Sequence, residues 1–248
     1  MRAFTALFAL ALAACASQPS APAITATSPH IAGAVASAKR PAEDRARDAD
    51  RKPAEMLAFA GIAPGQRVAD FIPGGGYFTR LLSEAVGPSG KVYALIPPPG
   101  AQSTEPPIKA VAAQYENVEV VQQSFTELKV PEPCDVIFTA QNYHDLHLKR
   151  FDLDVARVNA QIFAALKPGG VYVVVDHSAR AGAELGVADT LHRIDPAIVR
   201  RELEAAGFVY DGASEVLRNP ADTLELGVFD PKIRGKTDQF VMRFRRPK

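Results

Sequence analysis

The chain has 248 residues, 47% of them hydrophobic, which is enough for one large domain or two small ones with a substantial core. Its 28 Lys and Arg residues balance its 28 Asp and Glu residues, and it contains no tryptophan. This composition is not typical of proteins that bind nucleic acid through a basic or aromatic-rich surface, so we expect no nucleic acid partner.

The amino-terminal segment is predicted to direct export. An apolar run over residues 3–14 follows one positive charge and is too short to span a bilayer, so residues 1–14 have the pattern of a signal peptide. Leu12-Ala13-Ala14-Cys15 resembles the lipobox of bacterial lipoproteins, which implies acylation of Cys15 and anchoring at the periplasmic face of a bacterial membrane. An ordinary signal peptide with an incidental cysteine, or an overlong start, is the alternative.

The next segment is predicted to connect this anchor to the folded domain. Residues 15–37 consist largely of Ala, Ser, Thr and Pro, which is typical of a flexible tether with little to bury. Residues 39–52 are highly charged and are predicted to begin a helical extension with a solvated face, so the domain spans residues 38–248. Cys134 lies in an apolar run and is predicted to be a core residue without a disulfide partner.

From residue 53 onward, strand and helix patterns alternate. A helix is predicted to begin at Pro53 and end at Gly61, and the first strand ends at Asp70. Later strands are expected at residues 91–96, 118–121, 135–140 and 171–175, from Phe208 onward, and at 238–245. Helical patterns lie between them at residues 78–85, 108–115, 155–166 and 196–206. This alternation is typical of βαβ units in one parallel sheet.

Residues 68–82 have the pattern of a strand, a tight glycine-rich turn and a helix. Gly74, Gly75 and Gly76 follow the strand, and glycines let a backbone turn sharply and approach a ligand closely. The free N–H groups of the following helix would face whatever occupies the turn. The pattern indicates the first unit of a nucleotide-binding α/β domain; a plain turn with glycines for packing is the alternative.

The order of these parts over residues 53–248 resembles the class I S-adenosylmethionine (SAM)-dependent methyltransferases. Residues 70–77 are similar to the family's Asp-x-Gly-x-Gly-x-Gly motif, and Leu166-Lys167-Pro168-Gly169-Gly170 is similar to the turn many members carry before the fifth strand. Asn142-Tyr143-His144-Asp145-Leu146 resembles the polar segment that lines their active site. The resemblance extends to a group of bacterial predicted methyltransferases that share the Pro-Gly-Gly-Gly-Tyr and Asn-Tyr-His-Asp-Leu-His stretches.

The resemblance implies a Rossmann-like, doubly wound sheet of seven mostly parallel strands with an antiparallel terminal strand. The ligand would lie at the carboxyl ends of the strands, near the switch in strand order. The activity implied is transfer of a methyl group from SAM to a small-molecule acceptor. The cofactor-binding residues implied are Asp70, Gly74, Gly75, Gly76, Tyr77, Ser124 and Asn142.

Two polar residues after the fourth strand are the catalytic candidates. His144 would act as a base, because its reference pKa is near neutrality, and Asp145 would hold substrate or cofactor. A solvent-exposed loop is the alternative for both. For Asp70, which the motif places near the methionine end of the cofactor, a cap for the glycine turn is the alternative.

Three positions depart from the family pattern. Ile72 replaces the first glycine of the motif, and Ile96 stands where an acidic residue usually accepts hydrogen bonds from ribose hydroxyls. Ser124 stands where an acidic residue often contacts adenine. The candidates to replace the missing carboxylate are Glu105, Gln122 and Gln123.

Other polar residues are expected near the same edge of the sheet. Asp176 and His177 end the fifth strand, where they face substrate or cap the strand. A segment with His192, Arg193 and Asp195 is placed over the cleft, although Asp195 is also explained as a helix N-cap. Arg51 and Glu55 either cover the site or belong to a surface helix.

A metal site built from His144, Asp145, Asp176 and His177 is not predicted, because these residues lack a compact metal-binding spacing. The leading hypothesis is therefore a membrane-tethered SAM-dependent methyltransferase. One alternative is a catalytically silent binding protein that keeps the fold and has lost the cofactor. Another is an NAD-dependent oxidoreductase, which the lack of Gly-x-Gly-x-x-Gly and of the acidic residue disfavours.

Overall fold

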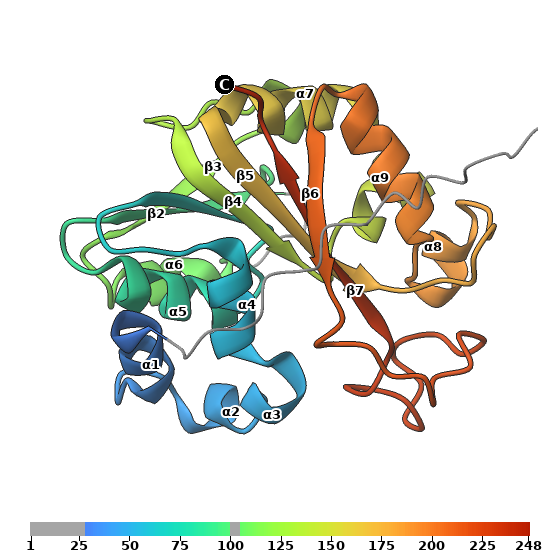
Figure 1. The fold of residues 1–248 in the computed structure, drawn as a ribbon, viewed down its shortest axis with the longest axis horizontal. Helices are drawn as coiled ribbons and strands as arrows, with labels where there is room; N and C mark the ends of the chain where they lie inside the picture. Colours follow the sequence, from blue (N-terminus) through green and yellow to red (C-terminus); the bar gives the residue numbers. More distant parts are fainter. Residues whose placement is uncertain (1–27, 100–104) are drawn as a thin grey trace, which may run out of the picture.

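The computed structural model describes residues 28–99 and 105–248 (Figure 1). The predicted signal peptide, Cys15 and most of the predicted tether lie outside the described residues, so these remain predictions. Within the described ranges, none of the helices combines the length and the apolar composition that crossing a membrane requires.

One seven-stranded sheet forms the centre of the domain. Its strands are β1 (Arg67–Phe71), β2 (Lys91–Ile96), β3 (Val118–Gln122), β4 (Cys134–Ala140), β5 (Leu166–His177), β6 (Val209–Ser214) and β7 (Gln239–Arg245). Their spatial order is β3-β2-β1-β4-β5-β7-β6, with β7 antiparallel to both neighbours and the pairs from β3 to β5 parallel. The predicted doubly wound sheet with an antiparallel terminal strand is confirmed.

Helices cover both faces of this sheet (Figure 1). They are α1 (Pro29–Ala36), α2 (Ala42–Arg45), α3 (Asp48–Arg51), α4 (Pro53–Ala60), α5 (Tyr77–Val86), α6 (Pro107–Ala112), α7 (Val155–Ala165), α8 (Val187–Leu191) and α9 (Pro196–Ala205). Because side chains alternate along a strand, each strand contributes to two cores. The core with Val68 and Phe138 packs under α1, α4, α5 and α6, and the core with Ala69 and Ile137 packs under α7 and α9.

The amino-terminal extension begins earlier than the composition indicated. The prediction of a flexible tether up to residue 37 is wrong for residues 29–36, which form α1. Ile31 and Ala34 of this helix are each 2% exposed and belong to the core that α4 and α5 line. A few apolar residues at helical spacing, within an otherwise Ala- and Ser-rich stretch, are sufficient to join the helix to the domain.

The fifth strand is also longer than predicted. β5 begins at Leu166, directly after α7, and its pairing with β4 shifts between Cys134 and Val136. The Lys-Pro-Gly-Gly stretch therefore forms an irregular start of the strand instead of a separate turn. Gly170 is needed there, because a Cβ atom would lie 2.9 Å from the Lys167 carbonyl oxygen.

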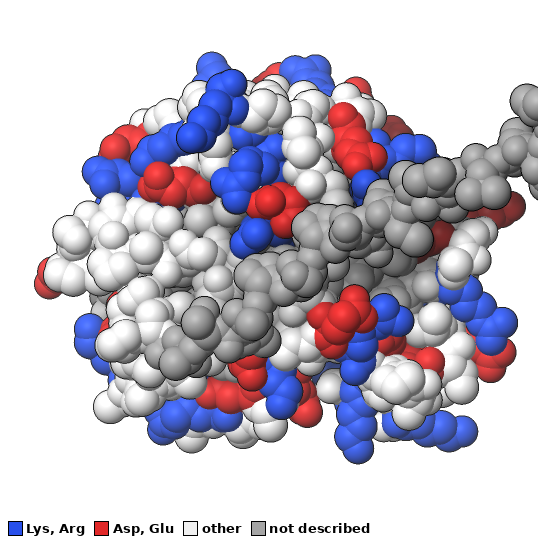
Figure 2. Space-filling model, in the orientation of Figure 1, with Lys and Arg blue, Asp and Glu red and all other residues white. Residues whose placement is uncertain are grey.

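Charges are mixed on the surface. On the face shown in Figure 2, Lys and Arg side chains alternate with Asp and Glu side chains, and no continuous basic surface is visible there. This face offers little of the field that draws nucleic acid to a protein. The absence of a nucleic acid partner remains a prediction.

Candidate functional site

The glycine-rich turn lies where the strand order reverses, between β1 and β4. Open α/β sheets bind ligands at the carboxyl ends of their strands at such a point. Gly74 and Gly76 have φ values of +53° and +79°, which glycine adopts without steric cost. At Gly76, a Cβ atom would also lie 2.9 Å from Cγ2 of Val111 in α6. Gly76 is thus required for packing behind the turn, whereas its neighbours Gly74 and Gly75 line a cavity there.

Ile72 adopts a left-handed conformation at φ +61°. This is the position of the motif at which glycine was expected, and for a β-branched residue the conformation costs on the order of 1–2 kcal/mol. Asn142 holds the strained backbone, since its Nδ2 donates to the carbonyl oxygens of Ile72, at 2.9 Å, and Ala140, at 2.7 Å. The hydroxyl of Thr139 donates to the neighbouring carbonyl of Phe71. The backbone at Ile72 therefore has a conformation typical of glycine, although the residue is isoleucine.

Asp70, at the end of β1, is 3% exposed. Its carboxylate accepts hydrogen bonds from the Thr79 hydroxyl, at 2.6 Å, and from the Thr79 backbone N–H in α5. Burial raises the pKa of Asp70 to about 6, although the Thr79 hydrogen bonds and the charge of Arg51 oppose the shift. The residue caps the turn, as one interpretation proposed, and it also lines a cavity.

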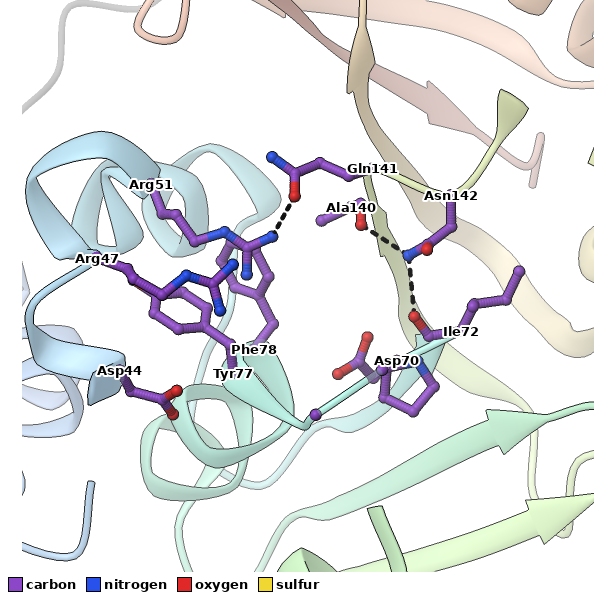
Figure 3. Close-up of a pocket in the computed structure, with 13 residues that line it drawn as sticks. Asp44, Arg47, Arg51, Asp70, Ile72, Tyr77, Phe78, Ala140, Gln141 and Asn142 are labelled. Carbon is purple, nitrogen blue, oxygen red and sulfur yellow. Dashed lines mark hydrogen bonds between the residues drawn. The ribbon is translucent and has the colours of Figure 1, made fainter. Parts of the chain in front are cut away.

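That cavity, of about 220 Å³, is the first of three at this edge of the sheet. In Figure 3 the Asp70 carboxylate and the guanidinium groups of Arg47 and Arg51 lie on opposite sides of it and point toward the space between them. Arg51 donates to Oε1 of Gln141 at 2.6 Å and lies over the Tyr77 ring. Burial, with the nearby charge of Arg47, lowers the pKa of Arg51 to about 10. The cavity therefore presents both signs of charge to a ligand.

The second cavity, also about 220 Å³, is apolar. It shares Ile72 with the first cavity, so the two meet at the strained residue. Its other lining residues are Pro97, Pro98, Ser124, Phe125, Asp145, Leu146, Phe151 and Leu153. Ser124 exchanges a hydrogen bond with the hydroxyl of Thr126, at 2.9 Å. A flat apolar group fits the chemistry of this lining.

The third cavity, of about 430 Å³, borders the first. The two share Arg47, Arg51 and Gln141. Its remaining wall includes His177 and the exposed ring of Phe229. A molecule in this space would lie beside the glycine-turn cavity.

His144 opens a short 3-10 helix after β4 and is buried. Its Nδ1 lies 2.8 Å from Oδ1 of Asp176, and its backbone N–H donates to Oδ2 of the same residue. Burial lowers the pKa of His144, but the charge and hydrogen bond of Asp176 outweigh burial, so the net pKa is raised. Burial lowers the pKa of neighbouring His177 to about 4. The pair of His144 and Asp176 is a fixed, oriented unit, not an exposed loop.

The structure brings most of the predicted site residues together. The first cavity is lined by Asp70, Gly74, Gly75, Tyr77 and Asn142, and the second by Ser124 and Asp145. Asp176 and His177 end β5 at the same edge, as expected. Ile96 ends β2 and is 7% exposed, which agrees with its predicted position at the end of the second strand.

Other predicted positions have structural roles. Arg193 does not cover the cleft, because it is fully buried and pairs with Asp222 at 2.9 Å. Asp195 caps α9, as predicted. The three candidates for the missing carboxylate do not line these cavities: Glu105 pairs with Lys109, and the side chains of Gln122 and Gln123 donate to backbone carbonyls.

Arg47 and Gln141 were missed by sequence reasoning. Arg47 belongs to the charged extension, which was assigned a solvated face, and its place in the site depends on how the extension folds back. Asp48 holds the extension against the domain, because it pairs with Arg40 at 2.5 Å and accepts a hydrogen bond from the hydroxyl of Tyr77, in α5, at 2.6 Å. The spacing of Arg47 and Arg51, one helical turn apart, was the available signal.

No protein-family model matches the chain. Among the solved structures that resemble it are three methyltransferases. A SAM-dependent methyltransferase from Aquifex aeolicus has a TM-score of 0.54 and 21% identity, over 77% of this chain and 88% of that one. An arsenic(III) S-adenosylmethionine methyltransferase from Chlamydomonas reinhardtii has a TM-score of 0.55 and 19% identity, over 89% of this chain and 74% of that one. A SAM-dependent methyltransferase from Mesorhizobium loti has a TM-score of 0.54 and 17% identity, over 81% of this chain and 100% of that one. The chain has the fold of the class I SAM-dependent methyltransferases.

Proposed function

We propose that this protein transfers a methyl group from SAM to a small-molecule acceptor. The observation that carries the proposal is the charge arrangement of the first cavity, with Asp70 on one side and Arg47 and Arg51 on the other. It lies at the glycine-rich turn of a fold shared with solved SAM-dependent methyltransferases.

The chemistry of the cavity linings fits the parts of SAM. The methionine end carries an ammonium, a carboxylate and a sulfonium, which match the carboxylate of Asp70 and the guanidinium groups of Arg47 and Arg51. A bound cation beside Asp70 would favour its ionised form and offset the cost of burying it. The apolar second cavity, with Phe125 and Ser124, suits an adenine ring.

The ribose lacks its usual partner. Ile96 ends β2 where the family pattern has a carboxylate, and Asp145 is the carboxylate that lines the second cavity. We infer that the cofactor is held with fewer side-chain hydrogen bonds than usual, so that the charged first cavity supplies a larger share of the binding free energy.

When bound, SAM supplies an electrophilic methyl group, and the residues of this chain would orient the reactants and exclude water. The acceptor would occupy the third cavity, which borders the first at Arg47, Arg51 and Gln141. Gln141 bridges the two spaces, because it accepts from Arg51 and donates to Oε1 of Gln239 at 3.0 Å.

Calorimetric titration of the purified chain with SAM and S-adenosylhomocysteine tests this proposal. We expect binding of both at one site per chain. Absence of binding to either would overturn it and favour a catalytically silent protein. Binding of NADH in place of the SAM pair would favour an NAD-dependent oxidoreductase.

We also propose that Cys15 is acylated and tethers the domain to a bacterial membrane on its periplasmic side. The support is the lipobox-like stretch Leu12–Cys15 after an apolar run. Fractionation of cells that produce the full chain tests the tether. The wild type should sediment with membranes and Cys15→Ser should be released, whereas equal release of both would contradict the tether.

A further inference from the structure

We propose that His144, Asp145 and His192 form a binding site for a divalent transition-metal ion, a site beyond the proposed methyl transfer. One ligand atom from each residue lies within 4.8 Å of the other two. Nε2 of His144 is 3.4 Å from Oδ1 of Asp145, and Nδ1 of His192 is 3.9 Å from the same oxygen. Metal–ligand bonds of about 2.0–2.2 Å separate neighbouring ligand atoms by roughly 3 Å, so small side-chain movements would complete the site.

Hydrogen bonding does not account for the cluster. Both distances to Asp145 are longer than a good N–H···O hydrogen bond. Across residues 28–99 and 105–248, the side chains of Asp145 and His192 make no hydrogen bond at all. Both imidazoles thus lie within ion-pair distance of the Asp145 carboxylate without a hydrogen bond to it, and Asp145 and His192 keep 28% and 22% of their side chains exposed, so an ion could reach the point on which the three groups converge.

The orientation of His144 is set for a ligand. Asp176 is fully buried and binds Nδ1 of His144 at 2.8 Å, which turns Nε2 toward Asp145 and His192. A carboxylate behind a histidine, fixing its tautomer and direction, is the arrangement typical of metal-bound histidines.

His192 is also held in place. It ends α8 in a left-handed conformation, with φ +53°, and its ring lies between His144 and Phe229 at centroid distances of 5.4 and 4.9 Å. His177 is not one of the three residues whose ligand atoms converge, and its Nδ1 lies 2.7 Å from the hydroxyl of Thr237. The ligands are therefore two imidazoles and one carboxylate.

This donor set selects the class of ion. Imidazole favours Zn²⁺, Fe²⁺, Co²⁺ and Ni²⁺, whereas Mg²⁺ and Ca²⁺ prefer all-oxygen sites. Three protein ligands leave positions open for water or a second molecule, as in catalytic metal sites. Because Asp145 also lines the apolar cavity, the ion would lie beside the cofactor space assigned above. The spacing in the sequence gave no sign of this site, because His192 is remote from the other two ligands.

Cobalt binding to untagged full-length chain, freed of metal with a chelator, tests the site. We expect one equivalent of Co²⁺ to bind with visible d–d absorption, and Zn²⁺ to displace it and raise the melting temperature. His192→Asn keeps a residue that tolerates the left-handed conformation, and Asp145→Asn keeps the side-chain shape. Each should weaken Co²⁺ binding by at least about 100-fold, since loss of a second-shell partner alone costs about 10–100-fold.

His147→Gln is the matched control. His147 lies in the same short helix, and its Nε2 also pairs with a carboxylate, Oε2 of Glu202, at 3.1 Å, but no second histidine faces that pair. This variant should bind Co²⁺ like the wild type. Absence of Co²⁺ binding to the wild type, or equal binding by folded His192→Asn or Asp145→Asn, would overturn the proposal. No measurement uses SAM, so the result is independent of the proposed function.

Discussion

At the amino-terminal edge of the sheet, a cavity of about 400 Å³ is lined by Asp135, Lys167, Arg243 and Arg245, which all form ion pairs, the two arginines with Asp211 outside the lining. Lys167 lies 2.7 Å from Asp135, and Arg245 pairs with Asp211. At the carboxyl-terminal edge, the glycine-turn cavity is about half as large, at about 220 Å³. Asp70 lines it and forms no ion pair within the part of the chain that the structure describes.

The two edges of the sheet also differ in which residues adopt the left-handed backbone conformation. The left-handed residues beside the amino-terminal edge are glycines, Gly65 and Gly169, which adopt that conformation without strain. At the carboxyl-terminal edge Ile72 and Gln141 adopt this conformation in addition to Gly74 and Gly76. A buried charge without an ion pair and a strained backbone persist where function requires them. These two features therefore identify a site better than the volume of a cavity does.

The largest expected effect is on cofactor binding. Replacing Asp70 with Asn removes the carboxylate that faces the cationic groups of SAM in the proposed binding mode, and we expect affinity to fall by about 100-fold, as for loss of a buried charge partner. Asp135→Asn, at the other edge, should leave the affinity unchanged. Calorimetry with S-adenosylhomocysteine and SAM measures both variants. Equal weakening by both would remove the functional distinction between the edges.

The burial of Asp70 should also make stability depend on pH. Its folded pKa of about 6 is above the ordinary value of 3.8, so between these pH values the folded state keeps a proton that the unfolded state has released. Its contribution to stability is therefore present at low pH and is lost as pH rises through about 6. Relative to Asp70→Asn, the wild type should lose up to about 3 kcal/mol over this range.

Urea unfolding of both proteins at a series of pH values measures this difference. The comparison cancels the other titrating groups, while Arg51 and Thr79, which face Asp70, are present in both. A difference that is constant with pH would mean that Asp70 is not a desolvated charge.

Each edge of the sheet has one asparagine whose side-chain N–H groups donate to two backbone carbonyl oxygens. Asn142 bridges the carbonyls of Ile72 and Ala140, and Asn117, just before β3, bridges those of Ser83 and Gly87 at 3.0 and 2.9 Å. Asn142→Ala should cost about 2 kcal/mol of unfolding free energy, because two hydrogen bonds are lost, and Asn117→Ala about 3 kcal/mol, because Oδ1 of Asn117 also accepts a hydrogen bond from the Ser83 hydroxyl. Denaturant titration should show both losses, but only Asn142→Ala should weaken SAM binding. An equal effect of Asn117→Ala on binding would contradict the role of Asn142.

The smallest effect is expected at Ile72. Changing Ile72 to Gly relieves a strain of about 1–2 kcal/mol, which roughly offsets the lost apolar contact and the entropy of glycine. Its unfolding free energy should stay within about 1 kcal/mol of the wild type. Ile96→Gly, at the unstrained end of β2, should cost at least about 3 kcal/mol. A similar cost for both, in the same unfolding assay, would show that Ile72 is not strained.

Much of the fold was predictable, because most of the strands are short apolar runs and the longer helices have an apolar face, several of them with Gly or Pro at an end. These are local signals. The tether was mispredicted over α1 because composition hid the apolar face of Ile31 and Ala34, which only packing against α5 makes evident.

The candidate site was predictable in part. Asp70 and the glycines share one local motif, and Asn142 follows a buried strand. Arg47 and His192 reach the site through elements far from that motif in sequence, so the spacing of Arg47 and Arg51 and the expected position of the His192 segment over the cleft were the available signals, and neither identified the partners of these residues. Gly76 has a second requirement that its motif did not indicate: packing against Val111 leaves no room for a Cβ atom, and the predicted ligand contact of Gly76 stays a prediction.

The position of α1 also limits how far the domain can lie from Cys15. Since the helix begins at Pro29, the chain between Cys15 and the domain is residues 16–28, which even fully extended span at most about 45 Å. If Cys15 is acylated, as proposed, the domain can sample only a shallow layer next to the bilayer. An acceptor must then enter that layer to be methylated, and membrane-associated molecules would meet the enzyme at a higher local concentration than molecules in bulk solution.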